Sequence, residues 1–418
     1  MRECLSVPTI TILVNALDPN ALFTSRRKIR NSVRVLSYMF LVILMLIIYN
    51  ASSDRLSASS NTEFTESAAT QSERIQTHST SPFTKLVWHT FYQFVDPQTL
   101  DIHPNATWFA LSLFATDHEA MDPSIRNEHL EDQLLEQLRR ENITIDMGGY
   151  YNPDNVMDMK NCNQVNRTLT IVVPYRKRAQ NLLSFLSYMH RFLPLKAVRY
   201  RLVVLEQTSL KAFNRAKLFN AGLRELGLLI DEGKRPFTED VTTRLNCTNY
   251  CFVLHDVDKL PVSMQTPYEC HWNPLQLVRI GVARNKSAVM LGNIQLEKGK
   301  SEHWFYENFF GGVTVVNKRV LQRVNGMSNV FFGWGGEDDD FRARMTRRHI
   351  PVDLAPWNFS RFYFLDHAGD SPFNRRARTL LGGNRVWIRM NRDGMRQTRY
   401  TVRQRIVRPL YTLYQISV

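Results

Sequence analysis

Three apolar runs of strand length, separated by amphipathic stretches, constrain the fold of this chain more than any other feature. Residues 169–173 form the first run, which stops at a proline and is followed by an amphipathic stretch from Ala179 onward. Residues 200–207 repeat the strand pattern, and residues 213–229 after them are again amphipathic. Residues 250–261 read as a third hydrophobic strand. This alternation predicts an α/β sheet whose ligand site lies at the carboxyl ends of the strands.

Two aspartates, Asp256 and Asp258, lie near the end of the third predicted strand. Side chains two residues apart share one face of a strand, so both carboxylates point toward one ligand where the strand ends. Hard oxygen donors of this kind suit Mg²⁺ or Mn²⁺ bound to a diphosphate. A solvated strand end that leads into a turn is the alternative, and the D-x-D pattern by itself leaves both readings open.

Residues 333–341, GWGGEDDDF, place four consecutive carboxylates behind glycines and a tryptophan. One interpretation is the acidic first turn of a helix, where negative side chains are stabilised by the helix dipole. The other is a catalytic carboxylate beside a mobile loop whose glycines allow it to close.

The N-terminal part of the chain predicts membrane attachment. Residues 35–49 carry no charge, and five basic residues between Arg26 and Arg34 precede them. Residues 33–50 are therefore predicted to be a transmembrane signal anchor, with a cleaved signal peptide as the alternative. Basic residues on this flank predict a cytoplasmic tail over residues 1–32 and a lumenal location for the rest. Residues 51–100 are rich in Ser and Thr and predict a flexible stem, followed by a transition over 101–144 and a folded domain over 145–418.

Charge and cysteine content exclude some functions. The net charge is +14, but a nucleic-acid partner requires a cytosolic or nuclear address, which the predicted anchor argues against. An anionic sugar nucleotide or a polyanionic glycan remains as a partner, and a solvated basic surface without such a partner is the alternative. None of the five cysteines form a C-x-x-C pair, so a zinc site is not expected.

Six blocks in fixed order resemble the β-1,4-galactosyltransferase family of Golgi glycosyltransferases. They are MGGYYNP from residue 147, VVPYRKR from 172, FNRAKLFNAG from 213, CFVLHDVDKLP from 251, FFGGVTVVNK from 309 and FGWGGEDDDF from 332. The similarity covers residues 145–418 and implies a GT-A-like, Rossmann-like α/β domain with a mixed sheet. It also implies a single-pass type II protein of the Golgi membrane with its catalytic domain in the lumen.

The activity that the resemblance implies is inverting, metal-dependent transfer of galactose from UDP-galactose to a terminal N-acetylglucosamine, forming a β-1,4 linkage. The implied cofactor is Mn²⁺, with Mg²⁺ as the alternative ion. Three other functions stay open: transfer of N-acetylgalactosamine, transfer of galactose to xylose in a proteoglycan linker, and glycan binding without catalysis.

Matching positions carry the family's roles. The implied donor site contains Pro174, Tyr175, Arg176, Lys177, Arg178, Phe213, Asn214, Arg215, Asp256, Val257, Asp258, Phe309 and Trp334. The implied acceptor site contains Gly336, Glu337, Asp338 and Asp339, with Arg376 and Arg378 as further candidates. Asp338 is the implied catalytic base, Asp258 and His367 are the implied metal ligands, and Cys251 and Cys270 match a family disulfide. The acidic run is thus expected to contain one catalytic carboxylate, whose neighbours have partly structural roles.

The chain also departs from the family pattern. Phe364 stands where a ligating methionine is usual, and a phenyl ring cannot bind a metal. This departure predicts either a lower metal affinity or Asp366 as a substitute oxygen ligand. Phe309 stands where many members have tyrosine, and its bulk favours galactose over N-acetylgalactosamine. Cys162 lacks the usual upstream partner, which leaves Cys247 as the lumenal cysteine available to it.

Overall fold

The computed structural model describes residues 93–103, 105–106, 126–153, 168–228, 250–283, 290–291, 294–296, 300–365, 377–381 and 384–418. The predicted tail, the predicted anchor at 33–50 and most of the predicted stem lie outside these residues, so those assignments stay predictions. In the part of the chain that is described, no helix combines the length and apolar character needed to cross a bilayer.

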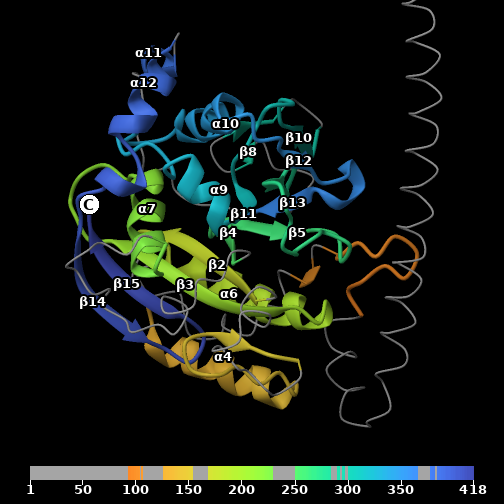
Figure 1. Ribbon diagram of the computed structural model, residues 1–418. Helices are drawn as coiled ribbons and strands as arrows, with labels where there is room; N and C mark the ends of the chain where they lie inside the picture. Colours follow the sequence, from red (N-terminus) through yellow and green to blue (C-terminus); the bar gives the residue numbers. More distant parts are fainter. Residues whose placement is uncertain are drawn as a thin grey trace, which may run out of the picture. The chain divides into compact units, whose positions relative to one another are not determined.

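A mixed sheet forms the centre of the domain (Figure 1). From edge to edge its strands are β12 (Asp353–Leu354), β6 (Leu275–Gln276), β11 (Val313–Asn317), β4 (Cys251–His255), β2 (Thr168–Tyr175), β3 (Arg199–Gln207), β15 (Thr412–Ser417) and β14 (Thr401–Val407), with β1 (Tyr150–Tyr151) pairing with the start of β3. The pairs β2–β3, β2–β4 and β3–β15 are parallel, whereas β11 runs antiparallel to β4 and β6. The predicted α/β class with a mixed sheet is therefore confirmed.

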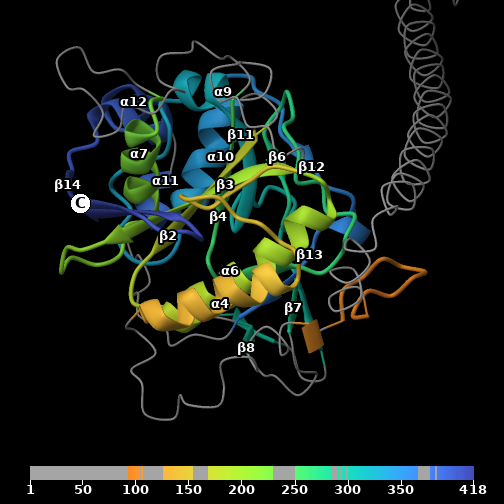
Figure 2. The ribbon, with the colours of Figure 1, turned by 90° about the horizontal axis from the view of Figure 1, so that it is seen from below.

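Helices cover both faces of this sheet because the inner strands bury side chains on both sides. Along β2, Ile171 and Val173 join one hydrophobic core and Val172 joins the other, as the two-residue period of a strand requires. The first core is covered by α4 (Glu128–Arg140) and α6 (Ala179–Leu195), which lie together in Figure 2. The second is covered by α7 (Arg215–Glu225), α9 (Lys318–Arg323) and α10 (Glu337–Arg347).

The packed domain begins earlier than the predicted boundary at residue 145. Three leucines of α4 are buried in the core beside α6, and Val95 and Ile102 join the same cluster. Without α4, part of the apolar surface of this core would face water. Residues predicted as stem end and transition therefore contribute to the domain.

The strand predictions are correct for the first two runs, except that the first strand does not stop at the proline, and wrong for the third. β2 continues through Pro174 to Tyr175, because its pairing with β4 has already ended at Val172 and no ladder bond on that side is lost. Residues 250–261, however, form two strands separated by a turn. β4 lies in the main sheet, whereas β5 (Lys259–Pro261) belongs to a second sheet with the order β10-β7-β13-β5.

The second sheet brings distant segments next to the end of β4. Its other members are β10 (Glu302–Trp304), β7 (Ile280–Ala283) and β13 (Arg361–Phe364). A separate pair is formed by β8 (Met290–Leu291) and β9 (Ile294–Gln295). The C-terminal part adds η3 (Trp357–Phe359), α11 (Ala377–Leu381), α12 (Arg385–Arg392) and η4 (Met395–Gln397).

Candidate active site

Arg215 connects three carboxylates at the centre of the candidate site. It is the first residue of α7, and its Nε donates to Asp256 Oδ1 at 2.6 Å. Its Nη1 donates to Asp338 Oδ1 at 2.5 Å and lies 3.9 Å from Glu337 Oε1. Asp256 follows β4, and Asp338 is the second residue of α10. One guanidinium thus joins the predicted donor site to the predicted base.

The charged groups of this cluster shift one another's pKa values. Burial disfavours the charge of Arg215, but Asp256, Asp338 and Glu337 outweigh that effect and raise its pKa. Burial raises the pKa of Asp338 well above its ordinary value; Arg215 opposes this rise, while Glu337 and Asp256 add to it. Burial likewise raises the pKa of Glu337 against the influence of Arg215. A carboxylate with a raised pKa is a better proton acceptor, which is what a general base requires.

Gly311 provides the space that Asp338 occupies. A Cβ atom added at Gly311 would overlap an oxygen of the Asp338 carboxylate and lie 2.5 Å from its Cγ. The carbonyl oxygen of Gly311 accepts a hydrogen bond from Gln276 Nε2 at 2.8 Å, which fixes this backbone segment. The FFGG and GWGGEDDD blocks therefore meet in space, a contact that their separation in sequence does not reveal.

The acidic run serves several purposes along the first turn of α10. Gly336, with φ 94°, occupies the N-cap position in the left-handed region, where glycine is favoured. Asp340 is fully buried and accepts from Arg344 Nε at 2.6 Å and from Arg389 of α12. Asp339 accepts from Tyr306 Oη at 2.5 Å. Asp340 therefore has a structural role, as was predicted for part of the acidic run.

Asp258 has the chemistry of a hard-cation ligand but is engaged by a neighbouring lysine. Its carboxylate is nearly buried and accepts from Lys259 Nζ at 2.7 Å. Asp256 bonds instead to Arg215, so the two aspartates pair with different cations. Phe364, which pairs with Lys259 across β5 and β13, offers no lone pair. Among the described residues, no group of three or more His, Cys, Asp or Glu side chains is placed to hold a metal.

The predicted nucleotide-binding turn lies at the carboxyl end of β2. Tyr175 is buried, and Arg176 Nη1 reaches the carbonyl oxygen of Lys211 at 2.6 Å, just before α7. Lys177 has φ 46° in the same turn. Because β2 and β4 are parallel neighbours, this turn and Asp256 lie at the same edge of the sheet.

Asn214, another predicted donor residue, is fully buried and caps α7. Its Oδ1 accepts from Lys217 N at 2.9 Å, and its Nδ2 donates to the carbonyl oxygen of Asn329 at 2.8 Å. The backbone N–H of Gly333 donates to the carbonyl oxygen of Phe213 at 2.8 Å. Residues 213–215 thus bond both to Asp338 and to Gly333, at the start of the loop that carries Trp334.

The sequence did not indicate the hydrogen bonds that fix residues 327–329, which precede this loop. Asn220 Nδ2 donates to the carbonyl oxygen of Met327 at 2.7 Å, and Asp393 accepts from Asn329 Nδ2 at 2.7 Å and from Ser328 Oγ at 2.6 Å. Arg344 and Asp340 are spaced four residues apart, a signal that could have been read as a helical ion pair. No local pattern indicates the contacts to Asp393 or to Arg389, which come from the C-terminal part of the chain.

The remaining predicted donor residues differ in exposure and contacts. Val257 is buried, and Trp334 has about half of its surface exposed, at 48%. The Phe309 ring stacks on Phe305 with their centroids 4.2 Å apart, and it contacts Tyr306 edge-on at 5.6 Å. Tyr306 in turn bonds to Asp339, so this aromatic segment lies against the start of α10.

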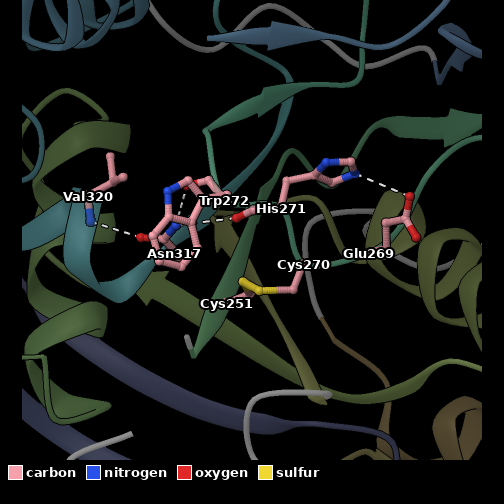
Figure 3. Close-up of a disulfide and its surroundings, with 7 residues drawn as sticks. All are labelled: Cys251, Glu269, Cys270, His271, Trp272, Asn317 and Val320. Atoms are coloured by element: carbon pink, nitrogen blue, oxygen red, sulfur yellow. Dashed lines mark hydrogen bonds and ion pairs between the residues drawn. A yellow bond between two sulfur atoms is a disulfide. The ribbon is translucent and has the colours of Figure 1, made fainter. Parts of the chain in front are cut away.

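The predicted disulfide between Cys251 and Cys270 is present, with the two Cα atoms 5.7 Å apart (Figure 3). It ties the start of β4 to the segment that precedes β6. Asn317 supports the same segment by donating to the carbonyl oxygen of Trp272 at 2.8 Å and by capping α9 at Val320 N (Figure 3). The strand that Asp256 follows is therefore anchored at its other end.

Several predicted residues lie outside the described ones. They are His367, Arg376, Cys162 and Cys247, together with the substitute ligand Asp366. Arg378 lies in α11, but its side chain is not described. The roles predicted for these residues remain predictions.

Comparison with known proteins identifies the family of this chain. Residues 118–271 match the model of the N-terminal region of glycosyl transferase group 7, and residues 298–368 match the N-terminal domain of galactosyltransferase. The β-1,4-galactosyltransferase 4 of Mus musculus is 30% identical over 284 residues, which cover 67% of this chain and 70% of the relative. The chain belongs to the β-1,4-galactosyltransferase family. It is therefore a glycosyltransferase.

Two other known proteins are also similar to this chain. The β-1,4-galactosyltransferase 4 of Cricetulus griseus is 28% identical over 354 residues, covering 78% of this chain and 89% of the relative. Among solved structures, a mutant of a Drosophila β-1,4-galactosyltransferase 7 in complex with manganese, UDP-Gal and xylobiose is 22% identical. It covers 60% of this chain and 94% of that chain, with a TM-score of 0.45.

Proposed function

We propose that this galactosyltransferase-family enzyme transfers galactose from UDP-galactose, with inversion, to the 4-hydroxyl of a terminal N-acetylglucosamine. The observation that carries the proposal is the bridge from Asp256 through Arg215 to Asp338. The proposal is supported by a partly buried carboxylate of raised pKa next to the carboxyl edge of the sheet, where an α/β fold binds its nucleotide. Family membership supports galactose as the transferred sugar.

In the proposed reaction Asp338 accepts the proton of the acceptor hydroxyl. The hydroxyl oxygen forms a bond to the anomeric carbon of galactose as the bond to the diphosphate breaks, and UDP leaves with the electron pair. Arg215 orients the Asp338 carboxylate and keeps a positive charge beside it. Because only the ionised carboxylate is a base, transfer should fall as the pH is lowered through the raised pKa of Asp338.

We propose Mn²⁺ as the metal, held by Asp258 and, by prediction, His367, with Mg²⁺ as the weaker alternative. The nearly buried Asp258 carboxylate is a hard oxygen donor that fits such an ion. The ion would supply positive charge that offsets the charge developing on the leaving diphosphate.

Phe309 supports galactose over N-acetylgalactosamine. Its ring is fixed by stacking on Phe305 and leaves little freedom to make room for an N-acetyl group. The acceptor is proposed from the family alone, and the predicted anchor supports a Golgi location with a lumenal catalytic domain.

Transfer by the purified full-length chain tests the proposal. UDP-galactose and UDP-N-acetylgalactosamine would each be offered with N-acetylglucosamine or a xyloside, in Mn²⁺ and in chelator. We expect transfer of galactose to N-acetylglucosamine, reduced about 10²–10⁴-fold in Asp338→Asn. Asp339→Asn is the matched control, because its carboxylate bonds to Tyr306 and should mainly change the KM of the acceptor. A folded protein that transfers no sugar to any acceptor would instead favour a glycan-binding protein.

A further inference from the structure

Lys259 is a buried cation next to the predicted metal ligand. Its Nζ donates to Asp258 Oδ2 at 2.7 Å, and the two side chains are only 10% and 7% exposed. The same Nζ lies 3.6 Å from the centre of the Phe364 ring. A carboxylate and the negative face of an aromatic ring both attract an ammonium group. Together they form a small cation-binding site, which is occupied by the ammonium group of Lys259.

The backbone fixes this arrangement. Lys259 begins β5 and pairs directly opposite Phe364 of β13, so their side chains lie on one face of the second sheet. Leu365 N donates to the carbonyl oxygen of Asp258 at 2.9 Å, which continues the pairing past the end of both strands. Phe364 is buried and stacks on Phe305 with centroids 6.0 Å apart. Neither the ring nor the lysine stem has room to leave without changing this packing.

The residue at position 364 departs from the family pattern. A methionine that ligates the metal is usual at the position of Phe364, and a phenyl ring cannot take its place as a ligand. The ring instead faces an ammonium group, and that ammonium is bonded to the aspartate that the metal would use. At position 364, a contact to a side-chain cation thus stands in place of the metal contact that is usual in the family.

We propose that Lys259 is a resident cation of the donor site. The inference rests on the function proposed above. When no divalent ion is bound, Lys259 neutralises Asp258 and offers its charge to the diphosphate of the donor. A divalent ion must displace Lys259 from Asp258 in order to bind. The enzyme should therefore bind Mn²⁺ weakly and keep part of its nucleotide binding and transfer in chelator.

Mn²⁺ binding to the full-length chain tests the first consequence. The free-ion signal in electron paramagnetic resonance would be followed for Lys259→Gln, which keeps a hydrogen-bond donor without the charge, and for Lys259→Arg, which keeps the charge. We expect Lys259→Gln to bind Mn²⁺ about tenfold more tightly than the wild type, within the range known for residues that support metal ligands. Lys259→Arg should bind like the wild type.

Lys196→Gln provides the matched control. Lys196 is also largely buried and near a phenylalanine ring, at 5.9 Å from Phe192, but its Nζ bonds to the carbonyl oxygen of Met264 rather than to a carboxylate. Its removal should leave Mn²⁺ affinity unchanged. Phe364→Met adds a thioether in place of the ring and should also tighten Mn²⁺ binding, which gives a second route if Lys259→Gln folds poorly.

UDP binding in chelator, measured by titration calorimetry, tests the second consequence. Lys259→Gln should weaken metal-free UDP binding about tenfold, and Lys259→Arg should retain it. The proposal is overturned if Lys259→Gln leaves both the Mn²⁺ and the UDP affinity at wild-type values while sugar transfer proceeds. If both affinities shift as expected but no donor is turned over, the result supports the proposed role of Lys259 and contradicts the proposed reaction.

Discussion

Substituting Gly311 by alanine would test whether the position of Asp338 matters for catalysis. The added methyl carbon would lie 2.5 Å from Asp338 Cγ, whereas carbon atoms in contact are normally about 3.5–4.0 Å apart. The carboxylate must therefore move by about 1 Å or more. That movement would also stretch its 2.5 Å bond to Arg215.

The size of the effect follows from this displacement. A reacting group misplaced by about 1 Å costs about 10²-fold in rate, so kcat should fall by about that factor. Thermal stability should fall only slightly, by about 1–2 kcal/mol, because the Asp338 side chain is partly exposed and one hydrogen bond is weakened. Initial rates of transfer and a thermal unfolding curve would give both values.

A double-mutant cycle with Asp338→Asn makes the reasoning refutable. If Gly311→Ala acts through the base, it should reduce the residual rate of Asp338→Asn by less than about threefold, because the group that it displaces has already lost its function. An equal loss in both backgrounds would show that Gly311 acts independently of Asp338. A fully active Gly311→Ala would refute the assigned role of the carboxylate.

Three further changes concern stability. Asp340→Asn should cost about 3–5 kcal/mol in urea unfolding, because two arginines would keep their buried charges without the carboxylate; a loss below 1 kcal/mol would contradict this. Replacing Cys251 and Cys270 by serine should cost about 3 kcal/mol, since the bridge closes a loop with a sequence separation of 19; unchanged unfolding would argue against that estimate of loop entropy. Burial lowers the pKa of His190 to about 4, so the folded state binds fewer protons than the unfolded state below pH 6.5, and stability is lost as the pH falls. His190→Gln should therefore lose about 2 kcal/mol less than the wild type between pH 7 and pH 5, and parallel curves for the two proteins would exclude this contribution.

Local patterns predicted most of the elements that form the site. The first two strands, the helices after them and the acidic helix start were all indicated by apolar period and residue type. The third strand was the exception. Its apolar run is continuous, but the turn at Asp256–Asp258 moves the chain into another sheet, and the partner strand of β5 comes from residues 361–364. The hydrophobic pattern of a segment alone cannot show where the chain passes from one sheet to another.

The order of the motif blocks was sufficient to place the chain in its family and to pair Cys251 with Cys270, and it made Asp338 and Arg215 candidate site residues. Those conclusions need only residue types and their sequence. Tertiary structure alone revealed that Arg215 bridges Asp256 to Asp338, that Gly311 makes room for the Asp338 carboxylate and that Lys259 lies between Asp258 and a phenyl ring. Each of these depends on side chains from segments far apart in the chain, and their separation in space is set by strand pairing and packing rather than by any local preference.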